Sequence, residues 1–269
     1  MEVAGIIPER WTPWVPGAPR GYAPLLGVEL ELSHEAGFHL PAIEAVRRHL
    51  DADMHRFLAA GVYDGSVAGA EFVTSPTKLE IHQAYWPRLI PVLRAGGFYA
   101  ESGGGGLHVH CSRKAMVPGQ LDLLVALTML GGPEWEQFQM LVMGRTSERY
   151  AAGLPMSQAR PESTPDSLER AHAYIREQYA GERQHDLRYQ RINLMPKETV
   201  EFRQGHTTLN ADKLLSRVEC VHALLAFTRT AAKTSPLGHL FPEGLPSPRA
   251  FMGWVRRYKV WPHLAATSF

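Results

Sequence analysis

The stretch Gly27–Leu32 reads GVELEL and alternates apolar with acidic residues. Successive side chains of a β-strand point to opposite faces. On a strand, Val28, Leu30 and Leu32 would therefore share one face, and Glu29 and Glu31 would share the other. Two glutamates on one strand face are ordinary in a solvated sheet, so the meaning of this pair depends on which residues its neighbours carry.

Three more segments repeat this alternation. They are GLHVHCS at residues 106–112, YQRINLM at 189–195 and TVEFRQG at 199–205. Their polar faces would carry His108 and His110, Arg191 and Asn193, and Glu201 and Arg203 respectively. A hairpin around Asp64-Gly65 adds Asp64 and Glu71. An ordinary solvated face is richer in Thr, Ser, Lys and Gln.

So many carboxylates on one face would repel one another unless positive charge lies among them. Divalent metal supplies that charge, because Mg²⁺ and Mn²⁺ prefer carboxylate and water oxygens with an occasional imidazole. Arginine on the same face can bind phosphate oxygens in a bidentate manner. The joint pattern favours a metal-and-phosphate surface.

Each motif also has a plain structural interpretation. Glu201 with Arg203 is typical of an ion pair on a strand face, and Asp64-Gly65-Ser66 is a common turn. His108 and His110 need further ligands before they indicate a metal. The glycine run before them lacks the Lys-Ser/Thr ending of a phosphate-binding P-loop.

Apolar periodicity predicts helices at residues 41–60, 78–95, 120–130, 133–143, 165–180 and 211–233. The strand-like runs cluster as hairpins, around Asp64-Gly65 and around Pro196–Glu198, and do not alternate one by one with helices. This arrangement predicts an α+β fold with an antiparallel sheet, one face covered by helices and the other open to a ligand.

The chain has 269 residues and 45% hydrophobic content, which suits one large domain. Residues 1–24 are rich in Pro and Trp and predict an extended arm. Residues 25–233 form the predicted core, and the Pro-rich residues 234–269 a second wrapping segment. Cys111 and Cys220 have apolar neighbours, which predicts two buried free thiols.

The formal net charge is +1, so charge gives no reason to expect nucleic acid or an anionic membrane as a partner. We find no signal-peptide pattern and no long uncharged apolar run. These features predict a soluble cytoplasmic protein. They leave the oligomeric state open.

The ordered motifs GVELEL, YDGSVAGAEFVTSP, GGLHVHCS, GRTSERYA and RINLMPKETVEFRQGHTTLN resemble the amidoligase family. That family belongs to the glutamine synthetase and glutamate-cysteine ligase superfamily of carboxylate-amine ligases. The resemblance covers roughly Gly27 to Phe227. It implies a curved antiparallel sheet that forms a partial funnel, as in the glutamine synthetase catalytic domain, with helices on the convex face and ATP and Mg²⁺ (or Mn²⁺) on the concave face.

The resemblance also implies residue roles. Glu31, Asp64 and Glu71 would surround one metal, and Glu29, His108 and Glu201 a second. His110, Asn193, Arg145 and Arg203 would contact the nucleotide phosphates or the substrate carboxylate. Arg191 is expected to bind phosphate or carboxylate, and Asp64 could take the proton of the amine. Asp64 stands where glutamine synthetase has a longer Glu, which weakens its case as a ligand.

The implied reaction joins a carboxylate substrate to an amine substrate at the expense of ATP, through an acyl phosphate. The partner could be an amino acid, a peptide or a modified polymer. Two alternatives stay open. One is a zinc-dependent hydrolase that uses the HxH pair, and the other is a non-catalytic relative of the ligases that binds a nucleotide or peptide.

Overall fold

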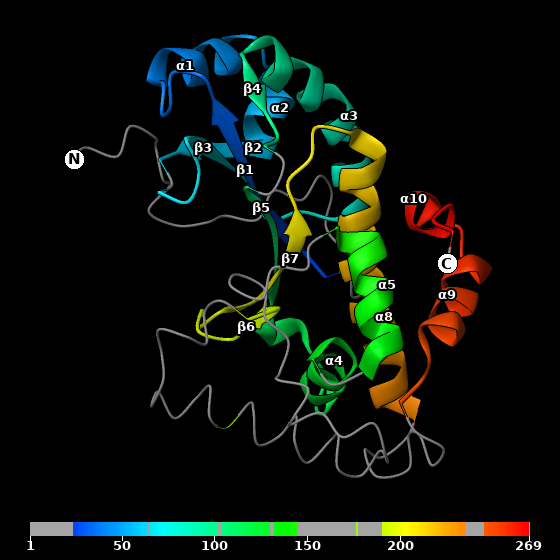
Figure 1. Ribbon diagram of the computed structural model, residues 1–269. Helices are drawn as coiled ribbons and strands as arrows, with labels where there is room; N and C mark the ends of the chain where they lie inside the picture. The colour runs from blue at the N-terminus through cyan, green and yellow to red at the C-terminus, as the bar shows by residue number, and fades with distance from the viewer. Residues whose placement is uncertain are drawn as a thin grey trace. The chain divides into compact units, whose positions relative to one another are not determined.

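The computed structural model describes residues 24–63, 65–101, 104–129, 132–144, 176, 190–234 and 245–268 (Figure 1). The chain forms two compact units. The first unit comprises Met1–Cys111 and Gly205–Val218, and the second comprises Ser112–Gln204 and Glu219–Phe269. The single domain and its boundaries at 24 and 233 stay predictions. The predicted N-terminal arm lies outside the described residues except for Pro24.

The first unit contains an open antiparallel sheet. Its strands are β1 (Leu26–His34), β2 (Leu58–Val62), β3 (Gly69–Thr74), β4 (Phe98–Tyr99) and β5 (Gly106–Ser112). Strand β1 is central, because it pairs with β3, β4 and β5, and β2 pairs with β3. All these pairings are antiparallel, as predicted, and the hairpin predicted around Asp64-Gly65 is the β2–β3 pair. The finer likeness to a glutamine synthetase funnel stays a prediction.

The alternation predicted for GVELEL is confirmed. The side chains of Val28, Leu30 and Leu32 are fully buried. Helix α3 (Leu79–Ala95) is tied to the same strand through His82, whose Nε2 lies 2.9 Å from the carbonyl oxygen of Leu26. The buried Trp86 donates from its indole Nε1 to His82 Nδ1 at 3.2 Å. These contacts fix the helix on the sheet.

The single helix predicted at residues 41–60 is wrong. The chain instead forms α1 (Leu40–Arg48), α2 (Ala52–Phe57) and then strand β2. Asp51 explains the break, because its side chain accepts hydrogen bonds from the backbone N–H groups of Asp53 and Met54 and so starts a new helix. Helix α3 matches its predicted range, although it contains Pro87 and Pro91.

The second unit is mainly helical. It contains the short helix η1 (Arg113–Ala115), the helices α4 (Gln120–Met129), α5 (Gly132–Met143), α9 (Pro248–Arg257) and α10 (Pro262–Ala265), and the strands β6 (Ile192–Asn193) and β7 (Thr199–His206). Strands β6 and β7 pair antiparallel, which confirms the hairpin predicted around Pro196–Glu198. Helix α8 (Ala211–Thr234) and β7 each continue from one unit into the other.

Helices α9 and α10 were not among the predicted elements, which gave this region as a Pro-rich wrapping segment. The signal for α9 was present in the sequence. Ser247 caps it by accepting a hydrogen bond from the N–H of Ala250, and Pro248 occupies the first turn. Of the helix predicted at 165–180, only Arg176 is described, and it is helical. In the described part of the chain, the helices are too short or too polar to cross a membrane.

Candidate functional site

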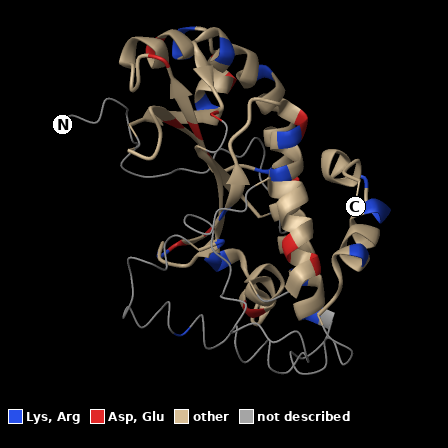
Figure 2. Ribbon diagram, viewed as in Figure 1, with Lys and Arg blue, Asp and Glu red and all other residues tan. Residues whose placement is uncertain are grey.

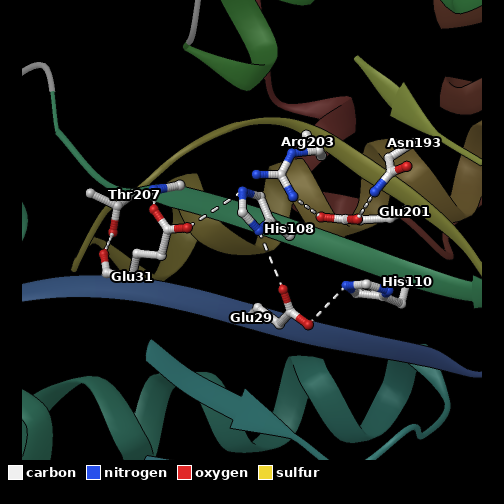
Figure 3. Close-up of polar contacts among 9 residues, drawn as sticks. Glu29, Glu31, His108, His110, Asn193, Glu201, Arg203 and Thr207 are labelled. Carbon is white, nitrogen blue, oxygen red and sulfur yellow. Dashed lines mark hydrogen bonds and ion pairs between the residues drawn. The ribbon is translucent and has the colours of Figure 1, made fainter. Parts of the chain in front are cut away.

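Five polar residues of the first unit form the acidic-histidine cluster, which comprises Glu29, Glu31, Glu71, His108 and His110. In the antiparallel register, Glu31 of β1 is paired with Glu71 of β3, and Glu29 is paired with His108 of β5. Cross-strand partners share a face. Figure 3 shows the side chains of Glu29, Glu31, His108 and His110 meeting above β1 and β5. The sheet thus brings together five of the residues that the sequence analysis selected.

Glu31 is held in place on both its backbone and its side chain. Its carboxylate is buried, and Oε2 accepts a hydrogen bond of 2.5 Å from the backbone N–H of Gly106. Its carbonyl oxygen accepts one of 2.6 Å from the hydroxyl of Thr207. The other carboxylate oxygen, Oε1, lies 3.7 Å from Nε2 of His108. One oxygen is therefore anchored to the backbone while the other is directed at the imidazole.

Gly105 allows the chain to pass this close to Glu31. Its φ is +69°, a conformation that favours glycine. A Cβ atom at this position would lie 2.9 Å from the carbonyl oxygen of Glu31 and 2.9 Å from Cγ2 of Thr207. The glycine run before the histidine strand thus has a steric role at this residue.

Glu29 connects the two histidines. Its Oε2 lies 3.3 Å from Nδ1 of His108, and its Oε1 lies 3.0 Å from Nε2 of His110. Burial disfavours the charged form of Glu29, but the charges and hydrogen bonds of His110 and His108 outweigh burial and hold its pKa well below the usual range. Glu29 is accordingly a carboxylate anion between two imidazoles.

Glu31, Glu71 and His108 are placed to share one metal ion. Each offers one ligand atom, and these atoms all lie within 4.8 Å of one another. Two ligands on opposite sides of Mg²⁺ are about 4.2 Å apart, so the ligand atoms need only a small adjustment. Glu29 adds the carboxylate that commonly orients a metal-binding histidine through its other ring nitrogen. The family resemblance implied Asp64 in this set and not His108.

A second group of polar residues lies in the second unit, on β6 and β7. Asn193 donates from Nδ2 to Oε2 of Glu201 at 2.6 Å, and the guanidinium of Arg203 donates to Oε1 of the same carboxylate. Asn193 and Glu201 are buried, and 15% of the Arg203 side chain is exposed. Arg203 is therefore the counterion of Glu201, as the plain interpretation of this pair predicts. Figure 3 draws both contacts.

Arg191 has a partner that its sequence pattern does not predict. Its guanidinium lies 3.3 Å from Oε1 of Glu136 on α5 and 3.5 Å from the carbonyl oxygen of Thr128 on α4. Its own carbonyl oxygen accepts a hydrogen bond from the N–H of Arg203. Nothing in the local pattern of α5 distinguishes the half-buried Glu136 from other polar helix residues.

The remaining predicted residues are not tested by these contacts. Asp64 and Arg145 lie outside the described residues. The second predicted metal set draws Glu29 and His108 from the first unit and Glu201 from the second. His110 and Asn193, expected near the nucleotide, contact Glu29 and Glu201 respectively.

Comparisons with known proteins give little further information. No family model matches the sequence, and no curated protein matches it. Among solved structures, the crystal structure of the complex between the prokaryotic ubiquitin-like protein Pup and its ligase PafA matches with a TM-score of 0.37 and 10% sequence identity. The match covers 90% of this chain and 57% of that chain. So low a TM-score does not establish a shared fold.

Proposed function

We propose that this protein is an ATP-dependent carboxylate-amine ligase that forms an amide bond. The observation that carries the proposal is the grouping of Glu31, Glu71 and His108 on three neighbouring strands, with Glu29 behind the histidine. The same residues belong to the motifs that resemble the amidoligase family. The strand register groups Glu31, Glu71 and His108, whereas the resemblance assigns Glu31 and Glu71 to one metal and His108 to the other.

The donor atoms suit Mg²⁺ or Mn²⁺. Two carboxylates and one imidazole give a mainly oxygen-based set, which these ions prefer, and they leave positions for water and phosphate. Bound there, the metal would supply positive charge beside the phosphoryl group of ATP. Glu31 would contribute Oε1, because Oε2 already accepts the hydrogen bond of Gly106. His108 would contribute Nε2 while Nδ1 donates to Glu29.

The reaction has two steps. An oxygen of the substrate carboxylate attacks the γ-phosphorus of ATP, and the bond between that phosphorus and the bridging oxygen breaks, which releases ADP. The amine then attacks the acyl carbon, phosphate leaves with the electron pair of the C–O bond, and the nitrogen loses a proton to give the amide. The protein's task is mainly to position the reactants and stabilise charge. Asp64 is our candidate acceptor for that proton.

The polar residues of β6 and β7 would bind the substrates and a second metal in this proposal. Arg203 and Arg191 would bind phosphate or the substrate carboxylate, in company with Asn193 and Arg145. The resemblance places Glu201 with Glu29 and His108 at a second metal. With Nε2 of His108 on the first ion and Nδ1 donating to Glu29, the carboxylates of Glu29 and Glu201 would be left to hold the second ion. These assignments rest on the family resemblance and on the charge of the side chains.

A zinc-dependent hydrolase is the weaker candidate. It needs both His108 and His110 on one ion together with a third ligand. Among the described residues, the three-ligand group of Glu31, Glu71 and His108 does not contain His110. Its Nε2 lies 3.0 Å from Glu29, which is consistent with a histidine held by a carboxylate.

The test is to incubate the protein with Mg·ATP, a pool of amines and candidate carboxylic acids. Mass spectrometry should find products one water lighter than the sum of an acid and an amine, with release of ADP and phosphate. Glu31→Gln and Glu201→Gln should each abolish this turnover without loss of the fold. Glu44→Gln is the matched control, because Glu44 is exposed on α1 and outside the proposed site.

The outcomes separate the hypotheses. Turnover that continues in Glu31→Gln would refute the metal assignment, and loss of turnover in Glu44→Gln would refute the choice of site. Hydrolysis without ATP, supported by Zn²⁺, would favour the hydrolase. ATP binding with no product for any acid and amine would favour a non-catalytic relative.

A further inference from the structure

An exposed basic segment follows α9 near the end of the described chain. Residues 256–260 read RRYKV, and all five are exposed. Arg249 is exposed in the first turn of the same helix and lies seven residues before Arg256. Residues so spaced lie on one face of a helix, about 10 Å apart. We call Arg249 and residues 256–260 the basic C-terminal surface.

The charge of this surface is unbalanced. Residues 245–268 contain four basic side chains and no acidic one. Figure 2 shows basic and no acidic residues on α9. Within the described chain, the side chains of Arg257 and Lys259 have no hydrogen bond or ion pair, and Arg256 donates only to the carbonyl oxygen of Thr267. Three cations that have no carboxylate partner among the described residues are thus presented to solvent.

The apolar side of the same segment is already used for packing. Phe251, Met252 and Val255 of α9 are buried, and so are Trp261 and Leu264 beyond it. The segment is fixed further by buried Glu219, which accepts hydrogen bonds from His263 Nδ1 and from the N–H of Leu264. Insertion into a bilayer needs a free apolar helix face. The apolar side chains of this segment are therefore already buried in the protein and are not free to insert into a bilayer.

We propose that the basic C-terminal surface binds an acidic polypeptide segment that carries an apolar or aromatic residue beside its carboxylates. Arginine pairs with carboxylates through two parallel hydrogen bonds. Tyr258 and Val260, 49% and 42% exposed, flank Lys259 in the sequence and offer apolar area beside the cations. Without the four basic residues, the chain has 24 basic against 27 acidic ones, so net charge outside the surface offers a long polyanion such as nucleic acid no further attraction.

The test measures the fluorescence anisotropy of a labelled peptide of alternating Glu and Tyr in the presence of the full chain. Arg257→Glu with Lys259→Glu should weaken binding at least about tenfold, and added salt should weaken binding to the wild type. The control is Arg47→Glu with Arg48→Glu, since these residues form the basic last turn of α1 and make the same change in net charge. Circular dichroism checks that each variant is folded.

Equal binding by the wild type and the Arg257/Lys259 variant would overturn the proposal. So would equal loss in the control variant, which would indicate a general effect of net charge. Tighter binding of a single-stranded oligonucleotide or of phosphatidylserine vesicles than of the peptide would also overturn it, because each identifies another class of partner. Failure of this experiment leaves the ligase proposal untouched, since the surface is outside the acidic-histidine cluster.

Discussion

Glu31 and Glu71 are directly paired across the β1–β3 register, and Glu31 is buried. Like charges at opposed positions destabilise a sheet. The pair is flanked by His108, whose Nε2 lies 3.7 Å from Glu31, and its geometry suits a shared cation. The repulsion between Glu31 and Glu71 should therefore lower the stability of the metal-free protein. This loss of stability can be measured without an assay of enzyme activity.

Glu71→Gln should raise the melting temperature of the metal-free protein, because it removes the repulsion from Glu31. It should also remove the stabilisation that Mn²⁺ or Mg²⁺ gives the wild type, which we expect to be about 2.7 kcal/mol at a metal concentration of one hundred times the dissociation constant. Thermal unfolding with and without metal measures both effects. If Glu71→Gln kept the full metal-dependent shift, Glu71 would not be a ligand.

Gly105→Ala should destabilise the first unit. The substitution forces a side chain into a backbone of φ +69° and brings its Cβ to 2.9 Å from the carbonyl oxygen of Glu31. We expect a loss of at least about 2 kcal/mol in the free energy of unfolding, measured by urea denaturation. Gly132→Ala is the control, because Gly132 has φ +75° and no atom within 4 Å of a built Cβ, and it should cost about 1 kcal/mol. If the two variants lost similar amounts of unfolding free energy, the close approach of residue 105 to Glu31 would add nothing to the destabilisation.

The two cysteines should not react with a thiol reagent in the native protein. Cys111 and Cys220 are free and buried, as the sequence predicts, and burial raises the pKa of Cys220 to about 12. At pH 8, a chromogenic disulfide reagent should detect no thiol before unfolding and two afterwards. Since the folded pKa of Cys220 is raised above its ordinary value of 9.0, this residue's contribution to stability is complete below pH 9 and declines as the pH rises towards 12. Rapid reaction in the native state would contradict the buried position.

Period-two alternation was sufficient to assign side chains to the faces of β1 and β5, because each side chain of a strand points to one of only two faces. It could not assign partners. Arg191 finds Glu136 at a separation of 55 residues, and no local pattern encodes such a tertiary contact. The position of His108 beside Glu31 and Glu71 likewise follows from the strand register, which the sequence does not state. Helix boundaries failed where a short cap decided them, as Asp51 does for α2 and Ser247 for α9.

Arg203→Met should destabilise the second unit, because it leaves the buried carboxylate of Glu201 without its counterion. Removing one partner of a buried ion pair costs about 3–5 kcal/mol, and we expect the lower end because 15% of the Arg203 side chain is exposed. Urea denaturation measures the change. A loss below about 1 kcal/mol would indicate that the pair behaves as an exposed one.

The double variant Arg203→Met with Glu201→Gln separates structure from function at this pair. The neutral amide needs no counterion and can still accept a hydrogen bond from Asn193, so the double variant should recover most of the stability lost in Arg203→Met. It should recover no ligase turnover if Glu201 and Arg203 act on metal and phosphate as proposed. Recovery of both stability and turnover would show that the pair serves the fold alone, which would remove Glu201 and Arg203 from the proposed site.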